Sequence, residues 1–506
     1  MNKFAKLLGF DPVAKKTSVR TEMTAGLVTF LAMAYILTVN PNQIFGSTAN
    51  AYWSSAFIAT AIAAVVGTLL MAFVAKMPLA QASGMGLNSM AGGLIGGWAG
   101  YAAAFTPGQT FFLVLISGLV FTLLSVIKIK GKTFRELVFD GMPVAVRGAI
   151  SVGIGLFIAY IGFQNAGVIV TNGYTQVGFV DFTNWGEQTV NSLVPASFAA
   201  KTAAVALIGL FLIAILDKLN VKGSIIFGII GATLVGIPLG VTDLSVLAGT
   251  TPGISWRFWE NIANFFTGDA TVFGSFIDVF RGDGVMPAGV SVFSVIMIVV
   301  TMSMIDMFDT MGTIVGCCSG NDVLSDENGK PRNYGKIMIC DATATCTGAM
   351  LGTSTVTTFV ESGAGVSAGG RTGLTALTTA ALFFASIFAM PVFAVIPSAA
   401  TAAALVYVGV LMMKNNVKNI DFGNAVKATS AFLTIVVMVL SYSITKGIGV
   451  GMIAYTVMSI ISYLVEMIKY AAGKKQGEKP VWSVSVIAII VSLLFVAYFF
   501  VPTTLF

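Results

Sequence analysis

The chain has 506 residues, 56% of them hydrophobic and only 10% charged, and its mean hydropathy is +0.89. This composition lies far outside that of soluble globular domains and indicates a protein that crosses a membrane many times. The sequence has four cysteines and no histidine, so the usual zinc, haem and Cys/His sites lack ligands, and we expect no metal and no cofactor. The net charge of +6 is concentrated in loops, which is typical of membrane topology and not of nucleic-acid binding.

Apolar runs long enough to span, or nearly span, a bilayer follow one another along the whole chain. They cover about residues 24–42, 53–75, 109–127, 147–170, 199–216, 222–240, 291–316, 372–395, 397–413, 426–443, 447–468 and 483–502. Three further stretches, 80–100, 336–351 and 353–368, are apolar but rich in glycine, serine and threonine, so we expect broken or short spans there. The run 483–502 is a surplus C-terminal helix. The sequence thus predicts an all-α, multi-pass protein of the cell membrane.

Basic residues predict the orientation of these spans. The first 21 residues are basic and lack the apolar core of a cleavable signal peptide, so we expect this end to stay cytoplasmic. Counting spans from there places almost all later basic clusters on the same side and the C-terminus outside. The expected divisions are a cytoplasmic segment 1–21, a first repeat 22–241, an extracellular loop 242–290, a second repeat 291–468, and a cytoplasmic linker with the extra helix in 469–506.

The two halves of the chain resemble each other. "MPVAVRGAISVGIGLFIAYIG" (142–162) is echoed by "IPSAATAAALVYVGVLM" (396–412), and "KGSIIFGIIGATLVGI" (222–237) by "KGIGVGMIAYTVMSI" (446–460). Each half holds seven predicted spans, and an odd number forces the second copy to be inverted, as in many secondary transporters. The alternative is that glycine-rich spans resemble one another by composition alone.

Four carboxylates lie within predicted spans, where each costs roughly 2.5 to 3.5 kcal/mol unless it has a partner, a cavity or a function. Asp306 and Asp309 are three apart on one helical face, Asp341 begins "DATATCTGAMLG", and Glu361 lies in "GTSTVTTFVESGAGVSAGGRTG" (352–373). For Asp306 a structural pairing or helix cap is an equal alternative. A buried carboxylate without a cationic partner can exchange a proton near neutral pH, so such acids are candidates for proton coupling.

The segment around Glu361 is expected to be half extended and half helical. "GTSTVTTFV" is β-branched and too short to span as a helix, whereas "SGAGVSAGG" suits a helix start. Such a break frees backbone N–H groups for a polar ligand near Thr358, Ser362 and Gly363. The first half has a counterpart in "ASGMGLNSMAGGLIGG" (82–97), with Asn88 near the corresponding place. Two broken segments in matching positions indicate a transporter site.

Several stretches carry a family resemblance: "MTAGLVTFLAMAYILTVNPNQIF" (23–45), "GMGLN" (84–88), "DMFDTMGT" (306–313), "LGTSTVTTFVESGAGVSAGGRTGLTA" (351–376) and "ALVYVGVLMM" (404–413). They resemble the adenine/guanine/hypoxanthine permeases, a branch of the nucleobase:cation symporter-2 (xanthine/uracil permease) family. The likeness runs from about residue 17 to 470. It implies seven plus seven inverted spans in a core and a gate domain, with short strands in the third and tenth spans that cross at the substrate.

The resemblance also implies proton-coupled uptake of purine nucleobases. Matched position by position, it gives substrate contacts to Asp309 (with Asp306 one turn earlier), Glu361 and Asn88, and it places Asp341 where the family keeps a polar residue. We expect the coupling proton at Glu361, Asp309 or Asp341.

This sequence departs from the family pattern after "GMGLN", where Ser89, Met90 and Ala91 replace the usual phenylalanines, and Ser83 stands where proline is common. The stacking wall and the preferred purine therefore stay open.

Other functions are weighed against this one. An anion channel or exchanger on the same scaffold is disfavoured because Glu361 would repel an anion, and a membrane enzyme lacks a metal cluster or a nucleophile with its base. A uracil or xanthine permease is the nearer alternative, which "DMFDTMGT" disfavours. Arg371 is expected to mark a cytoplasmic boundary. Proton or sodium coupling, and a monomer or a homodimer, stay open.

Overall fold

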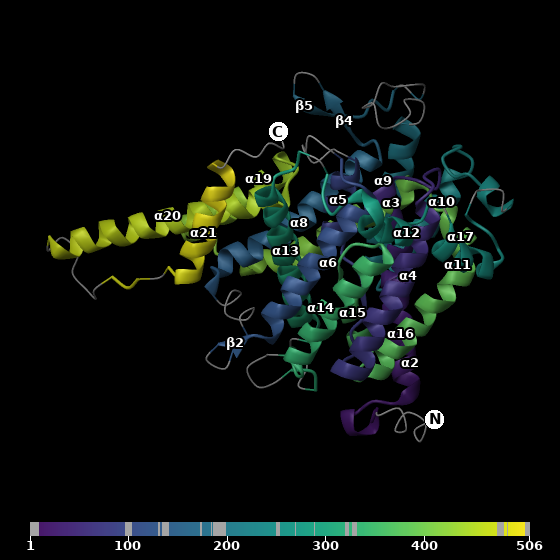
Figure 1. The fold of residues 1–506 in the computed structure, drawn as a ribbon, viewed down its shortest axis with the longest axis horizontal. Coiled ribbons are helices and arrows are strands. Elements are labelled where there is room, and N and C mark those ends of the chain that lie inside the picture. Colours follow the sequence, from purple (N-terminus) through teal and green to yellow (C-terminus); the bar gives the residue numbers. More distant parts are fainter. Residues whose placement is uncertain are drawn as a thin grey trace. The chain divides into compact units, whose positions relative to one another are not determined.

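A computed structural model describes residues 10–96, 104–129, 132–133, 141–172, 175–183, 185, 199–248, 253–268, 270–287, 289–318, 323–325, 331–472, 480–482 and 484–500. These residues form mostly helices together with three two-stranded sheets (Figure 1). They belong to two compact units, which are described separately below. The first comprises Met1–Ser125 and Ile158–Tyr407, and the second comprises Val126–Phe157 and Val408–Thr504.

The elements follow one another in the order that the hydropathy pattern predicts. The first half contains α2 (Val19–Met33), α3 (Ile36–Phe45), α4 (Trp53–Leu70), β1 (Gln81–Ser83), α5 (Met85–Gly96), α6 (Pro107–Val126), β2 (Lys128–Ile129), β3 (Lys132–Thr133), α8 (Val144–Asn165), β4 (Ile169–Asn172), β5 (Gln176–Phe179), α9 (Ala199–Lys218) and α10 (Ser224–Gly236). The second half contains α11 (Phe258–Thr267), α12 (Val272–Asp278), α13 (Val292–Cys318), α14 (Tyr334–Leu351), β6 (Val356–Thr358), α15 (Ser362–Ser367), α16 (Gly373–Ser386), α17 (Met390–Ala394), α18 (Ser398–Asn416), α19 (Ala425–Leu440), α20 (Ile444–Ala471) and α21 (Val486–Phe500).

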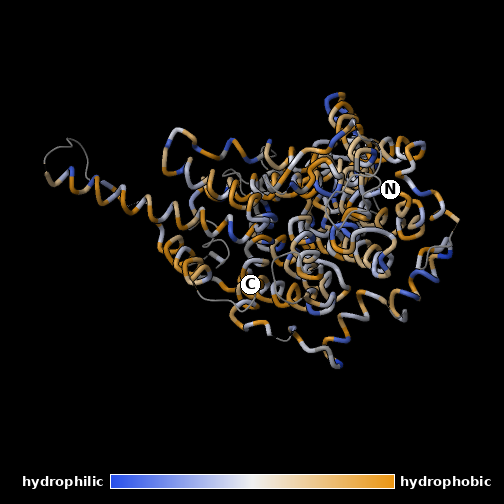
Figure 2. Tube along the Cα trace, turned by 90° about the horizontal axis from the view of Figure 1, so that it is seen from above, coloured by the Kyte–Doolittle hydropathy of each residue, from blue (hydrophilic) through white to orange (hydrophobic). Residues whose placement is uncertain are grey.

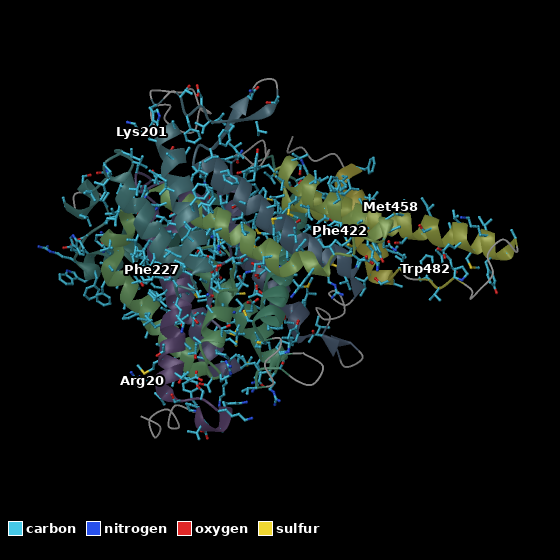
Figure 3. The ribbon with its side chains drawn as sticks, turned by 180° about the vertical axis from the view of Figure 1, so that it is seen from behind. Arg20, Lys201, Phe227, Phe422, Met458 and Trp482 are labelled. Atoms are coloured by element: carbon cyan, nitrogen blue, oxygen red, sulfur yellow. The ribbon has the colours of Figure 1, made fainter. Side chains whose placement is uncertain are left out.

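The expected membrane segments are present. Within the described chain, 7 helical segments are long and apolar enough to cross a membrane, and five shorter apolar helices accompany them. The other spans expected from the sequence correspond to α14 and to two strand–helix segments, β1 with α5 and β6 with α15. Hydrophobic residues run along most of these helices (Figure 2). In the first unit, Arg20 and Lys201 lie at opposite ends, and Phe227 lies between them with 46% exposure, as expected for a side chain facing lipid (Figure 3).

The stretch 336–351, expected to be broken or short, lies within the continuous helix α14, which has 18 residues. Two of its hydroxyls bond within the helix, and Asp341 and Thr345 bond to neighbouring elements. The hydroxyls of Thr343 and Thr347 each donate to the carbonyl four residues earlier, at 2.8 Å. Small side chains on α14 let it pack closely on α4 in the first unit, where Ala344 joins Ala63 and Val356 in a buried cluster.

The breaks predicted in the third and tenth spans are confirmed. β1 and β6 pair antiparallel, with Gln81 opposite Thr358 and Ser83 opposite Val356. The pairing continues beyond both strands, since Gly84 N–H donates to Thr355 at 2.8 Å and Phe359 N–H donates to Ala80 at 3.0 Å. Strands this short pair only a few of the backbone N–H and C=O groups of the broken segments. Side chains of the surrounding helices must therefore bond the groups that remain.

In the first unit, α2 packs against α16, and α16 also packs against α4 (Figure 1). Gly26 permits the close approach of α2, because a Cβ there would lie 2.6 Å from the carbonyl oxygen of Thr375. Glu22, fully buried on α2, accepts the backbone N–H groups of Arg371 (2.9 Å) and Thr372 (3.1 Å) just before α16 begins. This carboxylate thus caps the N-terminus of α16.

The expected extracellular loop 242–290 contains two helices, α11 and α12. Val272 at the start of α12 donates its N–H to Ser55 of α4 at 3.1 Å, which attaches this segment to the first unit. On α11, Phe258 packs against Phe388 with ring centroids 4.3 Å apart and the ring planes tilted by 44°. Trp259 on the same helix is 58% exposed beside this apolar surface, as is typical of a helix at the membrane interface.

In the second unit, α20 packs between α19 and α21. The surplus helix α21 is held by a hydrogen bond between the hydroxyls of Thr456 and Ser492, at 2.8 Å, and by Phe495 packing over Gly449. Glycine is required there because a Cβ would lie 2.6 Å from the Phe495 ring. The extra C-terminal helix expected from the sequence is therefore present and packed.

Candidate functional site

Glu361 occupies the junction between β6 and α15, at the break in the tenth span. Its side chain is only 6% exposed, and its Oε1 accepts a hydrogen bond of 2.6 Å from the hydroxyl of Tyr35. Its Oε2 is buried and has no hydrogen-bond partner among the described residues. An ionisable group with one oxygen held and one free is suited to receive a proton or a polar ligand at the free atom.

Asp306 and Asp309 lie on α13 and point to different partners. Asp306 is fully buried, and its Oδ2 accepts a hydrogen bond of 3.1 Å from Thr345 of α14. Asp309 is partly exposed, interacts with the side chain of Thr357 on β6, and is close enough to Glu361 for the two charges to repel. The structure therefore brings Asp309, rather than Asp306, to the strand crossing beside Glu361.

Asp341 of α14 connects the two crossing strands. Its Oδ1 accepts from Gln81 Nε2 of β1 at 3.0 Å and from both the N–H and the hydroxyl of Thr358 on β6, each at 3.2 Å. Its Oδ2 accepts from the hydroxyl of Thr310 on α13 at 2.7 Å. Asp341 is fully buried, so these donors replace the water that a carboxylate would otherwise bind. This bonding pattern favours a structural role.

Asn88 is fully buried in the first turn of α5. Its Nδ2 donates to Gln43 Oε1 at 3.2 Å, and its Oδ1 accepts from the hydroxyl of Ser354, which precedes β6. Gln43 in turn donates to Ser89 at 3.1 Å. Asn88 therefore joins α3, α5 and the segment before β6, and it lies further into its helix than Glu361, which sits at the strand–helix junction.

The remaining predicted residues also lie at the crossing. Ser362 at the start of α15 accepts from the N–H of Ala80 at 3.0 Å, which attaches the second broken segment to the first. Gly363 lies beside the sulfur of Cys317, which a Cβ at Gly363 would approach to 3.7 Å. Thr358 is bound to Asp341, so the hydroxyls of Thr358 and Ser362 serve the fold itself.

Sequence reasoning missed Tyr35, Gln81, Gln43 and Ser354. Tyr35 lies within the quoted stretch 23–45, between α2 and α3, and a tyrosine at a helix junction in an apolar span was the signal available. Gln81 carried a similar signal, because a glutamine inside an apolar segment needs partners. No group of three or more metal-ligating side chains occurs in the part of the chain that the structure describes.

Two broken segments that cross as paired strands, with buried acids at the crossing, define a secondary transporter of the inverted-repeat class. The fold agrees, because the chain superimposes on the transmembrane domain of the cyanobacterial bicarbonate transporter BicA with a TM-score of 0.58 at 15% identity, covering 84% of this chain and 97% of that one. A family model described as the permease family, that of the xanthine/uracil permeases, matches residues 20–450, and the chain belongs to this family.

Relatives support the same assignment. The adenine permease AdeP of Escherichia coli is 33% identical over 88% of this chain and 88% of its own length. The guanine/hypoxanthine permease PbuO of Bacillus subtilis is 33% identical over 88% of this chain and 92% of its own length. The protein is therefore a multi-pass membrane permease with a seven-plus-seven inverted-repeat fold, and not an enzyme.

Proposed function

We propose that this permease imports purine nucleobases, namely adenine, guanine or hypoxanthine, by proton symport with alternating access. The names of AdeP and PbuO support the substrate class, since both are 33% identical to this chain. The observation that carries the mechanism is the free Oε2 of the buried Glu361 beside Asp309 at the strand crossing. The likeness to BicA supports the fold alone and does not extend to an anion substrate.

The chemistry of the site suits a purine. A purine base is planar and carries N–H donors and lone-pair acceptors on adjacent edges, so carboxylate oxygens and an amide can read its outline. Glu361 and Asp309 provide the carboxylates in this proposal. Asn88 provides the amide, either by contacting the base or by holding the segment before β6 through Ser354.

The same acids provide for the coupling proton. Two neighbouring carboxylates that repel each other inside the membrane are not both charged at low cost, so a proton on one of the two, Glu361 or Asp309, is favoured. No ion pair neutralises Glu361 within the described part of the chain. Asp341 was a third candidate, but its oxygens already accept four hydrogen bonds, which supports Glu361 and Asp309 as the exchanging groups.

The test is uptake of radiolabelled bases into proteoliposomes that contain the purified permease. We expect an inward proton gradient to drive accumulation of at least one purine, with unlabelled purines competing and uracil and xanthine competing weakly. Glu361→Gln keeps the shape of the side chain, and we expect coupled accumulation to fall about tenfold or more, equivalent to ~1.4 kcal/mol. Accumulation driven by a sodium gradient at equal pH would contradict proton coupling, and preference for uracil or xanthine would contradict the substrate class.

A second arm tests Asn88. If its amide contacts the base, Asn88→Ala weakens every purine by roughly 1 to 3 kcal/mol, the cost of leaving a buried polar partner unmatched. Ser354→Ala is the matched control, because it removes the donor to Asn88 while leaving the amide in place. Equal losses in the two variants would mean that Asn88 acts through the fold and does not contact the substrate.

A further inference from the structure

Tyr35 lies at the junction between α2 and α3, where its side chain is fully buried. Its hydroxyl donates to Glu361 Oε1 at 2.6 Å and lies 3.9 Å from the sulfur of Met85. Among the described residues, Tyr35 is the one side chain that donates a hydrogen bond to the carboxylate of Glu361. The bond joins the first span of one repeat to the broken span of the other.

We propose that Tyr35 is a positioning residue that holds Glu361 Oε1, so that Oε2 alone binds both the coupling proton and the edge of the transported base. The proposal deepens the function proposed above and rests on it for the identity of the base. In the protonated state, the proton on Oε2 is donated to a ring nitrogen or carbonyl oxygen of the base.

The proton balance involves Glu361 only. The proton arrives at Oε2 from the outer side and leaves from the same atom to the cytoplasm, while the phenol of Tyr35 keeps its own proton throughout. A phenol is suited to this task because it stays neutral at physiological pH and donates a charge-assisted hydrogen bond to a carboxylate. The proton and the base then bind the same atom, Oε2, so the binding of one changes the binding of the other. This mutual effect is the basis of coupling.

The surroundings of Glu361 support this assignment. Among the residues that the structure describes, the other titratable groups close to Glu361 are Asp309 and Cys317, both on α13. Cys317 directs its thiol toward the backbone carbonyl of Val360 at 3.5 Å, and Asp309 interacts with Thr357. Neither one donates a hydrogen bond to the Glu361 carboxylate, so removal of the Tyr35 hydroxyl leaves Oε1 without its donor.

The backbone around Tyr35 is fixed in the same way. Gly365 on α15 lies directly against α2, where a Cβ would be 2.9 Å from the carbonyl oxygen of Ala25. Thr17, just before α2, donates to the carbonyl of Gly369 at 3.1 Å. Together with the cap that Glu22 provides to α16, these contacts hold α2 and α15 together, so the Tyr35–Glu361 pair is arranged in advance of substrate binding.

The test compares Tyr35→Phe with the parent in proteoliposomes over a range of pH. The variant keeps the ring and its packing and removes only the hydroxyl. Because that hydroxyl stabilises the charged carboxylate, its loss makes the carboxylate hold a proton to higher pH, and we expect the half-maximal pH of purine uptake to rise by about one unit. Tyr455→Phe, which removes a hydroxyl from α20, is the matched control and leaves the profile unchanged.

A second variant guards against a folding defect in the first. Incorporation of 3-fluorotyrosine at position 35 keeps the size of the side chain and makes the phenol a stronger donor, so the half-maximal pH falls instead of rising. A profile that superimposes on that of the parent in both substitutions would overturn the proposal.

Infrared titration separates this proposal from the proposed function. The carboxylic C=O band of Glu361, assigned by its loss in Glu361→Gln, should titrate at higher pH in Tyr35→Phe even without substrate. A parent protein that moves no purine would refute the function while this band still reports on Tyr35. A band that titrates identically with and without the hydroxyl would refute the role of Tyr35 alone.

Discussion

Asp341 offers the sharpest test of how the crossing strands are held. Asp341→Ala removes the acceptor of four hydrogen bonds, from Gln81, Thr310 and, twice, Thr358. The two hydroxyls can turn elsewhere, and Gln81 keeps a contact of 3.3 Å to Thr358, but the backbone N–H of Thr358 is left buried without an acceptor. That orphaned group costs about 1 to 3 kcal/mol, and the lost charge-assisted bonds add about 2 kcal/mol.

Asp341→Asn should behave differently. Its remaining oxygen can still accept from Gln81 and from Thr358, and its new amide can donate to the hydroxyl of Thr310. The expected cost is therefore only about 1 kcal/mol. If Asp341 is structural, the asparagine variant keeps proton-driven uptake whereas the alanine variant loses it together with stability.

The assay is thermal unfolding of the purified protein, followed by uptake at matched protein amounts. Thr310→Val is the control, because it removes one of the donors and leaves the strands bound to Asp341. The reasoning is refuted if Asp341→Asn is as stable as the parent yet no longer accumulates substrate against a proton gradient. That result would make Asp341 a group that must titrate.

Two further predictions concern other parts of the fold. Glu22→Ala removes the cap on α16 and leaves the N–H of Thr372 and the side chain of Thr375 without this acceptor. We expect the free energy of unfolding to fall by about 2 to 4 kcal/mol, measured as a lower Tm. An unchanged Tm would mean that the cap contributes nothing. Trp259, 58% exposed on α11, should be quenched by brominated lipid in nanodiscs more strongly than Trp185, which is 47% exposed after the β4–β5 hairpin; equal quenching would remove α11 from the membrane interface.

The sequence alone predicted the membrane spans and both breaks. Hydropathy is a local property, so each apolar run indicates a span without knowledge of its neighbours. The extended half at Val356–Thr358 could be predicted because the β-branched "GTSTVTTFV" is too short to cross as a helix, whereas the strand β1 was expected only from the family resemblance. The sequence also singled out Glu361 and Asp309, because acids in an apolar span are costly wherever they point.

The partners of those acids were decided only by the tertiary structure. Tyr35 and Glu361 are 326 positions apart, and Gln81 and Asp341 are 260 apart, so no local pattern connects them. Asp306 and Asp309 share one helical face in the sequence, yet Asp306 bonds Thr345 of α14 and Asp309 interacts with Thr357 of β6. Composition determines which side chains must be satisfied inside the membrane, and packing determines which of them remains free for the substrate.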